Sequence, residues 1–132
     1  MTRSKGLLSV GLSLLLIIGA AVFFSSYNQE TFNGGRVKNP DAYLLDIQSM
    51  NGTDVHTLEL QAGAVLHIQF ETENGSLYME IKAPDGTSVY RGNGKEATDF
   101  TINIQESGVY TIVVEARRAK GIIHIELQEE TQ

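Results

Sequence analysis

Alternation of apolar and polar side chains over residues 99–127 constrains the fold of this chain more than any other sequence feature. In three successive segments, every second residue is a large apolar one, and most are β-branched or aromatic. The apolar sets are Phe100, Ile102 and Ile104; Tyr110, Ile112 and Val114; and Ile123, Ile125 and Leu127. A period of two with such residues predicts strands that bury one face and expose the other.

Five more strands of this kind are expected before residue 92. Turn signals separate several of them, among them Asn51-Gly52, Asn74-Gly75 and Pro84-Asp85-Gly86. Their inward residues are Tyr43, Leu45, Ile47, Leu58, Leu60, Leu66, Ile68, Phe70, Leu77, Met79 and Ile81. No helical pattern follows Phe24. We therefore predict an all-β domain over residues 41–128, an eight-stranded antiparallel β-sandwich of the jelly-roll kind.

This topology makes a geometric prediction about two histidines. In a jelly roll the last strand lies between the first and the third, and the third strand also neighbours the sixth. Alternation points His67 and His124 outward, so they should share one solvent-facing surface, directly or diagonally opposite each other. One hypothesis is a pH sensor or a weak zinc site, with Glu71 or Glu126 as a further ligand. The alternative is a pair of ordinary exposed strand residues.

Residues 6–24 form an apolar run without charge, and Arg3 and Lys5 lie in the basic segment 1–5 before it. As a helix this run reaches about 28 Å, close to the roughly 30 Å hydrocarbon core of a bilayer. The basic residues keep the N-terminus in the cytoplasm and direct the rest of the chain outward. We interpret the run as an uncleaved signal anchor, a single-pass transmembrane helix. Cleavage near Gly19-Ala20-Ala21, which would release a secreted protein, is the alternative.

The exported part is expected to begin with a flexible stalk over residues 25–40 and to end in a polar tail over residues 129–132. The chain has no cysteine, which excludes disulfides and thiolate metal sites. Beyond Tyr27 it has 8 basic and 16 acidic residues, a net charge of −8. Such a charge repels phosphate backbones, so we expect no nucleic-acid partner.

Four runs of this sequence are similar to known accessory domains. The runs cover residues 63–70, 77–86, 106–116 and 121–127, and include the turn Ser107-Gly108 followed by the inward Tyr110. They resemble emp24/GOLD-like sandwiches and bacterial pre-peptidase C-terminal domains. The resemblance implies a module without catalytic residues that contacts a protein or a polymer. Unlike the pre-peptidase domains, this chain has no attached protease, so the resemblance does not extend to a processing role.

Motifs for catalysis and cofactor binding are missing from the sequence. There is no Gly-x-Ser-x-Gly elbow, and residues 92–95 lack both Walker spacing and a following helix. Asp46, Asp54 and Asp85 would form a calcium site only if they converged at one end of the sandwich, and as turn residues they need no ligand. We expect no enzyme activity, no cofactor and no bound metal.

The candidates for partner binding are one basic cluster and two tyrosines. Arg117, Arg118 and Lys120 form the cluster, which either docks an acidic partner or is a solvated loop between two apolar strands. Tyr78 and Tyr90 are expected to be exposed. Two hypotheses follow: a membrane-anchored, non-catalytic interaction module for another envelope protein, or a module that binds carbohydrate or cell-wall polymer. Sugar sites usually need a stacking platform, and the absence of tryptophan favours the protein partner.

Overall fold

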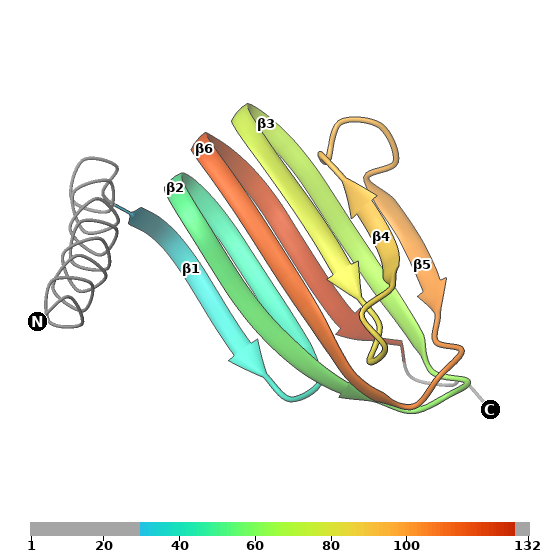
Figure 1. The fold of residues 1–132 in the computed structure, drawn as a ribbon. Coiled ribbons are helices and arrows are strands. Elements are labelled where there is room, and N and C mark those ends of the chain that lie inside the picture. The colour runs from blue at the N-terminus through green and yellow to red at the C-terminus, as the bar shows by residue number, and fades with distance from the viewer. Residues whose placement is uncertain (1–29, 129–132) are drawn as a thin grey trace, which may run out of the picture. The chain divides into compact units, whose positions relative to one another are not determined.

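The computed structural model describes residues 30–128, which contain six strands. The strands are β1 Thr31–Asn39, β2 Ala42–Leu60, β3 Val65–Lys82, β4 Ser88–Gly92, β5 Asp99–Asn103 and β6 Gly108–Leu127. All pairings are antiparallel, in the order β1-β2-β6-β3-β4, with β5 also paired to β3 (Figure 1). Nothing within residues 30–128 forms a helix that is long and apolar enough to cross a bilayer. The expected anchor at residues 6–24 and the tail at 129–132 lie outside the described residues.

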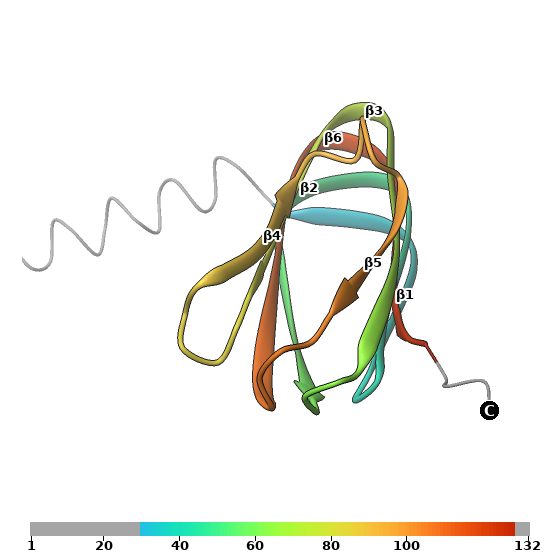
Figure 2. The same cartoon turned by 90° about the vertical axis from the view of Figure 1, so that its right-hand side faces the viewer.

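Three strands run through both layers of a sandwich. β2, β3 and β6 have 19, 18 and 20 residues, whereas a strand of a globular protein usually has about 5–6. Each bends near its middle and continues in the other layer (Figure 2). One layer contains β1, residues 42–50, 119–127 and 65–74, and β5; the other contains residues 52–60, 108–117 and 76–82, and β4.

The predicted number of eight strands was wrong, because three expected turns are bends within continuous strands. Asn51-Gly52 lies inside β2, Asn74-Gly75 inside β3, and the expected loop at residues 117–121 inside β6. The predicted neighbours are confirmed. The last segment of β6 pairs with the first part of β2 and the first part of β3, and that part of β3 also pairs with β5.

The bends depend on residues with left-handed backbone conformations. Gly52 has φ 114°, Gly75 φ 68° and Arg118 φ 44°, and the strand registers shift beside them. A Cβ on Gly75 would lie 2.1 Å from the carbonyl oxygen of Arg118, so the two backbones pass too closely for any side chain there. The N–H of Arg118 donates to Oδ1 of Asn51 at 2.9 Å. The Asn-Gly pairs therefore bend the long strands instead of ending them.

The expected flexible stalk is wrong for residues 31–39, which form β1. This strand pairs with residues 42–51 of β2, and the compact unit begins at Thr31, not at residue 41. Nearly every side chain of β1 is exposed, and only Phe32 packs partly against the core. Because β1 joins the sheet mainly through its backbone, it has none of the apolar alternation from which strands are recognised.

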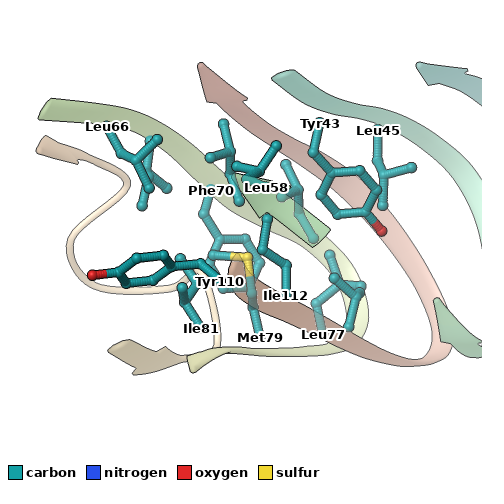
Figure 3. Close-up of a cluster of buried hydrophobic side chains, with 14 of the residues drawn as sticks. Tyr43, Leu45, Leu58, Leu66, Phe70, Leu77, Met79, Ile81, Tyr110 and Ile112 are labelled. Carbon is teal, nitrogen blue, oxygen red and sulfur yellow. The ribbon is translucent and has the colours of Figure 1, made fainter. Parts of the chain in front are cut away.

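The core lies between the two layers (Figure 3). Every predicted inward residue of β2 and β3 is buried, while Phe100, Ile102 and Leu127 are partly buried and pack against the core. Tyr110 enters the core as expected, and its hydroxyl donates to the carbonyl oxygen of Glu106 at 2.6 Å. Met50, Ala116 and Ala119, at or beside the bends, complete the core and were missed because the bulges interrupt the alternation there.

Replacing Gly75 with alanine tests the bends. Gly86 is the matched control, because it also has a positive φ of 90° but nothing lies within 4 Å of the position of its Cβ. Gly86→Ala should lower the free energy of unfolding by about 1–2 kcal/mol, the cost of the left-handed backbone. Gly75→Ala adds a backbone clash and should lower it by about 3 kcal/mol or more. Urea unfolding measures both; equal losses would contradict the close approach.

Candidate functional site

The two histidines lie where the topology placed them, but their rings have separate partners. His67 is opposite Glu126 and His124 is opposite Gln69, so the histidines are diagonal neighbours on one outer face. Nε2 of His67 is 2.6 Å from Oδ1 of Asp99 on β5, whereas Nε2 of His124 is 2.8 Å from Oδ1 of Asp46 on β2. The two imidazoles therefore point away from each other, that of His67 toward β5 and that of His124 toward β2. The geometric prediction is confirmed, and a joint function of the two remains a prediction.

The three aspartates considered for calcium have separate roles. Asp85 lies in the turn before β4, where it accepts hydrogen bonds from the hydroxyl and the N–H of Thr87, and these bonds lower its pKa. Asp46 pairs with His124, and Asp54 is buried. Over residues 30–128, no three His, Cys, Asp or Glu side chains gather closely enough to hold a metal ion.

The predicted partner-binding residues are brought together only in part: Arg117 is opposite Ser76 and so is a diagonal neighbour of Tyr78 on the outer face of the second layer. Lys120 lies in the bend of β6, with Nζ 3.4 Å from Oε2 of Glu73. Tyr78 is exposed on the outer face of the second layer. Tyr90 is partly buried: it is opposite the inward Ile81, its ring centroid lies 4.9 Å from that of Phe100, and desolvation raises its pKa. The expectation of an exposed Tyr90 was therefore wrong.

The outer face of the first layer is acidic, and we call it the acidic face. Asp46, Glu71, Asp99, Glu126 and the two histidines lie on it, with Val37, Leu44 and Ile122 between them. The hydrogen bond from His67 holds the pKa of Asp99 below its usual range.

A hollow of about 390 Å³ lies at the bend end of the acidic face. Its lining includes Asn33, Gln48, Asp46, Glu73 and Lys120, together with the backbone of three glycines at positions 34, 35 and 121. The hollow presents many hydrogen-bonding groups and no aromatic ring.

The outer face of the second layer has a different character, and we call it the valine–threonine face. Its members are Thr53, Val55 and Thr57 of β2, Val109, Thr111 and Val113 of β6, and Tyr78 of β3, together with the charged residues Glu59, Glu80, Lys82, Glu115 and Arg117. Five large apolar residues are exposed among the described residues, and three of them lie on this face: Val109 at 51%, Val55 at 49% and Tyr78 at 39%. A fourth, Val89, is at the register shift of the edge strand β4. Val55 is directly opposite Val113, and Thr57 opposite Thr111, so these side chains form a continuous surface.

Charges at the border of the valine–threonine face are of two kinds. Glu80 is paired, with Oε2 at 2.6 Å from Nε of Arg91 and Oε1 at 3.8 Å from Nζ of Lys82. The bond from Arg91 lowers the pKa of Glu80 and raises that of Arg91. Glu59, opposite Val109, and Glu115, opposite Thr53 and Tyr78, have no side-chain hydrogen bond or ion pair within residues 30–128. Two carboxylates without an ion pair among the described residues therefore lie on this face, Glu59 at one end and Glu115 between Thr53 and Tyr78.

Asp54 is the one buried charged residue among residues 30–128, with 8% of its surface exposed. The hydroxyl of Tyr43 donates to Oδ2, Nζ of Lys38 lies 3.2 Å from Oδ1, and Nη2 of Arg36 lies 3.6 Å from Oδ1. Lys38 also donates to the carbonyl oxygen of Val55 at 2.9 Å. Because both cations come from β1 and Asp54 lies in the second half of β2, this cluster ties the two layers together at their open edge.

The Asp54 cluster was missed at the sequence level, because its cations lie in the segment interpreted as a stalk. Its aromatic members strengthen it: the ring of His56 stacks on Tyr43 with centroids 5.1 Å apart, and Arg36 lies 4.2 Å above the ring of Phe32. Burial, and then the bond to Asp54, raise the pKa of Tyr43. A buried carboxylate that loses its partners is strongly destabilising, so the cluster couples β1 to the rest of the sandwich.

Comparison with known proteins assigns no family, since neither a protein-family description nor a curated protein matches the chain. One solved structure that is similar is that of PliG of Aeromonas hydrophila, a periplasmic inhibitor of g-type lysozyme. Its sequence is 19% identical, the TM-score is 0.47, and the match covers 71% of this chain and 92% of that one. Another is the carbohydrate-binding module TmCBM61 in complex with β-1,4-galactotriose, at 18% identity and a TM-score of 0.36, covering 69% and 66%. At these values neither structure assigns a function, and the resemblance to emp24/GOLD-like or pre-peptidase domains remains a prediction.

Removing β1 tests the role of Asp54. A fragment of residues 41–132 lacks Arg36 and Lys38, and an unpaired buried carboxylate costs about 3–5 kcal/mol, so it should unfold at lower urea than residues 30–132. Asp54→Asn is the matched test, because the amide carries no charge. We expect it to destabilise the longer fragment and to be neutral or stabilising in the shorter one. Equal effects in both fragments would show that β1 does not compensate the charge of Asp54.

Alkaline unfolding tests the state of Tyr43. Its pKa is raised in the folded protein, so the phenol stays protonated above the ordinary tyrosine pKa of about 10. Stability from this group is complete below that pH and is lost as the pH rises above it, because the unfolded chain then releases the proton. We expect the free energy of unfolding to fall more steeply above about pH 10 in the wild type than in Tyr43→Phe. Parallel curves in urea titrations would contradict this.

Proposed function

We propose that this protein is a non-catalytic interaction module that binds another envelope protein through its valine–threonine face. The observation that carries the proposal is that three of the five exposed large apolar side chains lie on one outer face, where Val55 is also directly opposite Val113. Isolated exposed apolar residues are ordinary in soluble proteins, whereas a continuous apolar surface is typical of a binding site. Tyr78 adds an aromatic residue of the kind enriched in protein interfaces.

A non-catalytic role fits the surroundings of the two histidine–aspartate pairs. Both pairs lie on the open acidic face, and within residues 30–128 neither imidazole is hydrogen-bonded to a hydroxyl group that would act as a nucleophile. Each pair is therefore a surface contact between an imidazole and a carboxylate, without an arrangement for acyl transfer.

The location outside the membrane is part of the same proposal. The apolar run at residues 6–24, with Arg3 and Lys5 before it, supports a single-pass anchor whose C-terminal domain is extracytoplasmic. A protein held in this way meets its partner at the outer surface of the membrane or in the space beyond it.

Binding of carbohydrate or wall polymer is the second candidate, and the hollow on the acidic face is the observation that favours it. Asn33, Gln48, Asp46, Glu73 and Lys120 offer donors and acceptors suited to sugar hydroxyls. Without an aromatic ring in the lining, the hollow lacks the stacking surface that strengthens such sites. Amide shifts at residues 33–35 and 120–122 on titration with soluble wall fragments would support this candidate over the first.

Photo-cross-linking in the intact chain tests the protein partner. A photoreactive amino acid replaces Val55 on the valine–threonine face, and the control replaces Val37, an exposed valine on the acidic face. In membranes of cells that produce the protein, we expect irradiation to yield one discrete heavier adduct from position 55, with a second protein identified by mass spectrometry. Position 37 should give little of it. The same adducts from both positions, or none from position 55, would refute the proposal.

A further inference from the structure

Asparagine followed directly by glycine occurs four times in this chain, and this pair of residues can modify itself. The pairs begin at Asn33, Asn51, Asn74 and Asn93. The backbone nitrogen of the glycine, which no Cβ shields, can attack the side-chain amide carbon of the asparagine. A C–N bond forms, ammonia leaves, and a succinimide ring results. Water then opens the ring to aspartate or to isoaspartate, in which the main chain runs through the former side chain.

Three of the four pairs begin within strand ladders, which oppose this reaction. Asn33 lies in β1, Asn51 in β2 and Asn74 in β3, each in register with a residue of a neighbouring strand. In a strand the side chain stands perpendicular to the sheet while the next nitrogen continues along the strand, so the two groups do not face each other. Rotating the backbone to bring them together would break hydrogen bonds of the ladder. The side chain of Asn51 is also held by the N–H of Arg118.

Asn93 is different, because it is exposed in the loop between β4 and β5 and its contacts favour the reaction. Its Oδ1 accepts a hydrogen bond from the N–H of Lys95 at 3.1 Å, which folds the side chain back along the loop toward the Gly94 peptide. The same bond polarises the amide carbonyl and stabilises the negative charge that develops on Oδ1 during the attack. The attacked carbon of Asn93 is therefore both positioned and activated.

The nitrogen of Gly94 is the nucleophile, and within residues 30–128 its N–H has no hydrogen-bond acceptor. The carbonyl oxygen of the same peptide unit, that of Asn93, accepts from the hydroxyl of Thr72 at 2.7 Å. Such a bond polarises the peptide unit and makes its N–H more acidic. The N–H of Thr72 also donates to the carbonyl oxygen of Gly94 at 2.9 Å, so the two bonds hold the loop in this arrangement.

We infer that Asn93 is a site of spontaneous modification, which converts to aspartate and isoaspartate before the other three asparagines do. The co-reactant is water, and no enzyme is needed. Conversion adds a negative charge, and isoaspartate also adds one atom to the main chain beside Gly94. A Cβ on Gly94 would lie 2.8 Å from ring atoms of Phe70, so the main chain has little room to lengthen there. The modified loop should therefore pack less well against the core.

Peptide mass spectrometry of the full-length protein in isolated membranes tests the site after storage at mildly alkaline pH. All four asparagines are scored in one digest, so Asn33, Asn51 and Asn74 are internal controls. In the folded protein, we expect conversion at Asn93 to exceed that at each of the others about fivefold or more. In protein unfolded in urea the four rates should be similar, because glycine follows each asparagine. Faster conversion at another asparagine in the folded protein, or the same preference for Asn93 in urea, would overturn the inference.

Two substitutions at Thr72 test how the loop promotes the reaction. Thr72→Val removes the hydroxyl and keeps the branched shape, whereas Thr72→Ser keeps the hydroxyl. We expect conversion at Asn93 to fall about threefold or more in Thr72→Val and to stay near the unsubstituted rate in Thr72→Ser. Melting temperatures check that both variants fold. An undiminished rate in Thr72→Val would overturn the activation of Gly94 by this hydroxyl.

Discussion

The close passage of bent strands at one end of the sandwich is the constraint on which the rest of the structure depends. β2, β3 and β6 each belong to both layers, so the position of each bend decides which side chains face the core in either half. Gly75 leaves room for the backbone of Arg118, and the side chain of Asn51 holds the N–H of Arg118. A shift of one residue at a bend would exchange the buried and exposed faces of the whole following segment.

The second constraint is electrostatic and acts at the open edge. Asp54 is buried beside Tyr43, and its charge is compensated by Arg36 and Lys38 from β1. A strand with almost no apolar side chains would add little by burial alone, but this strand supplies both cations of a buried pair. Lys38 also covers the carbonyl oxygen of Val55 and so occupies part of the free edge of β2, an edge that would otherwise be open to pairing with another chain.

The same three strands supply two outer faces of different chemistry. Where they lie in the first layer, their outward residues include most of the carboxylates and two histidines; where β2 and β6 lie in the second layer, their outward residues are chiefly valines and threonines. On the acidic face, the rings of His67 and His124 each contact a neighbouring carboxylate. Carboxylates without an ion pair within residues 30–128 lie on both faces, Glu71 and Glu126 on the acidic face and Glu59 and Glu115 on the other, so it is the exposed valines that distinguish the valine–threonine face.

The sequence by itself determined the all-β class and most inward residues of β2, β3 and β6, because a period of two directly reports which side chains a strand buries. The neighbours of the last strand followed from the jelly-roll order that this number of short strands suggested. It also placed His67 and His124 on one surface. Only the tertiary structure decided that Asn51-Gly52 and Asn74-Gly75 bend strands instead of ending them, since the same left-handed residues serve both purposes. It likewise decided that β1 belongs to the domain and that exposed valines meet on one face. The first outcome depends on the ion pairs of Asp54 with Arg36 and Lys38, and the second on the register between β2 and β6. Both are contacts between residues that are distant in the chain.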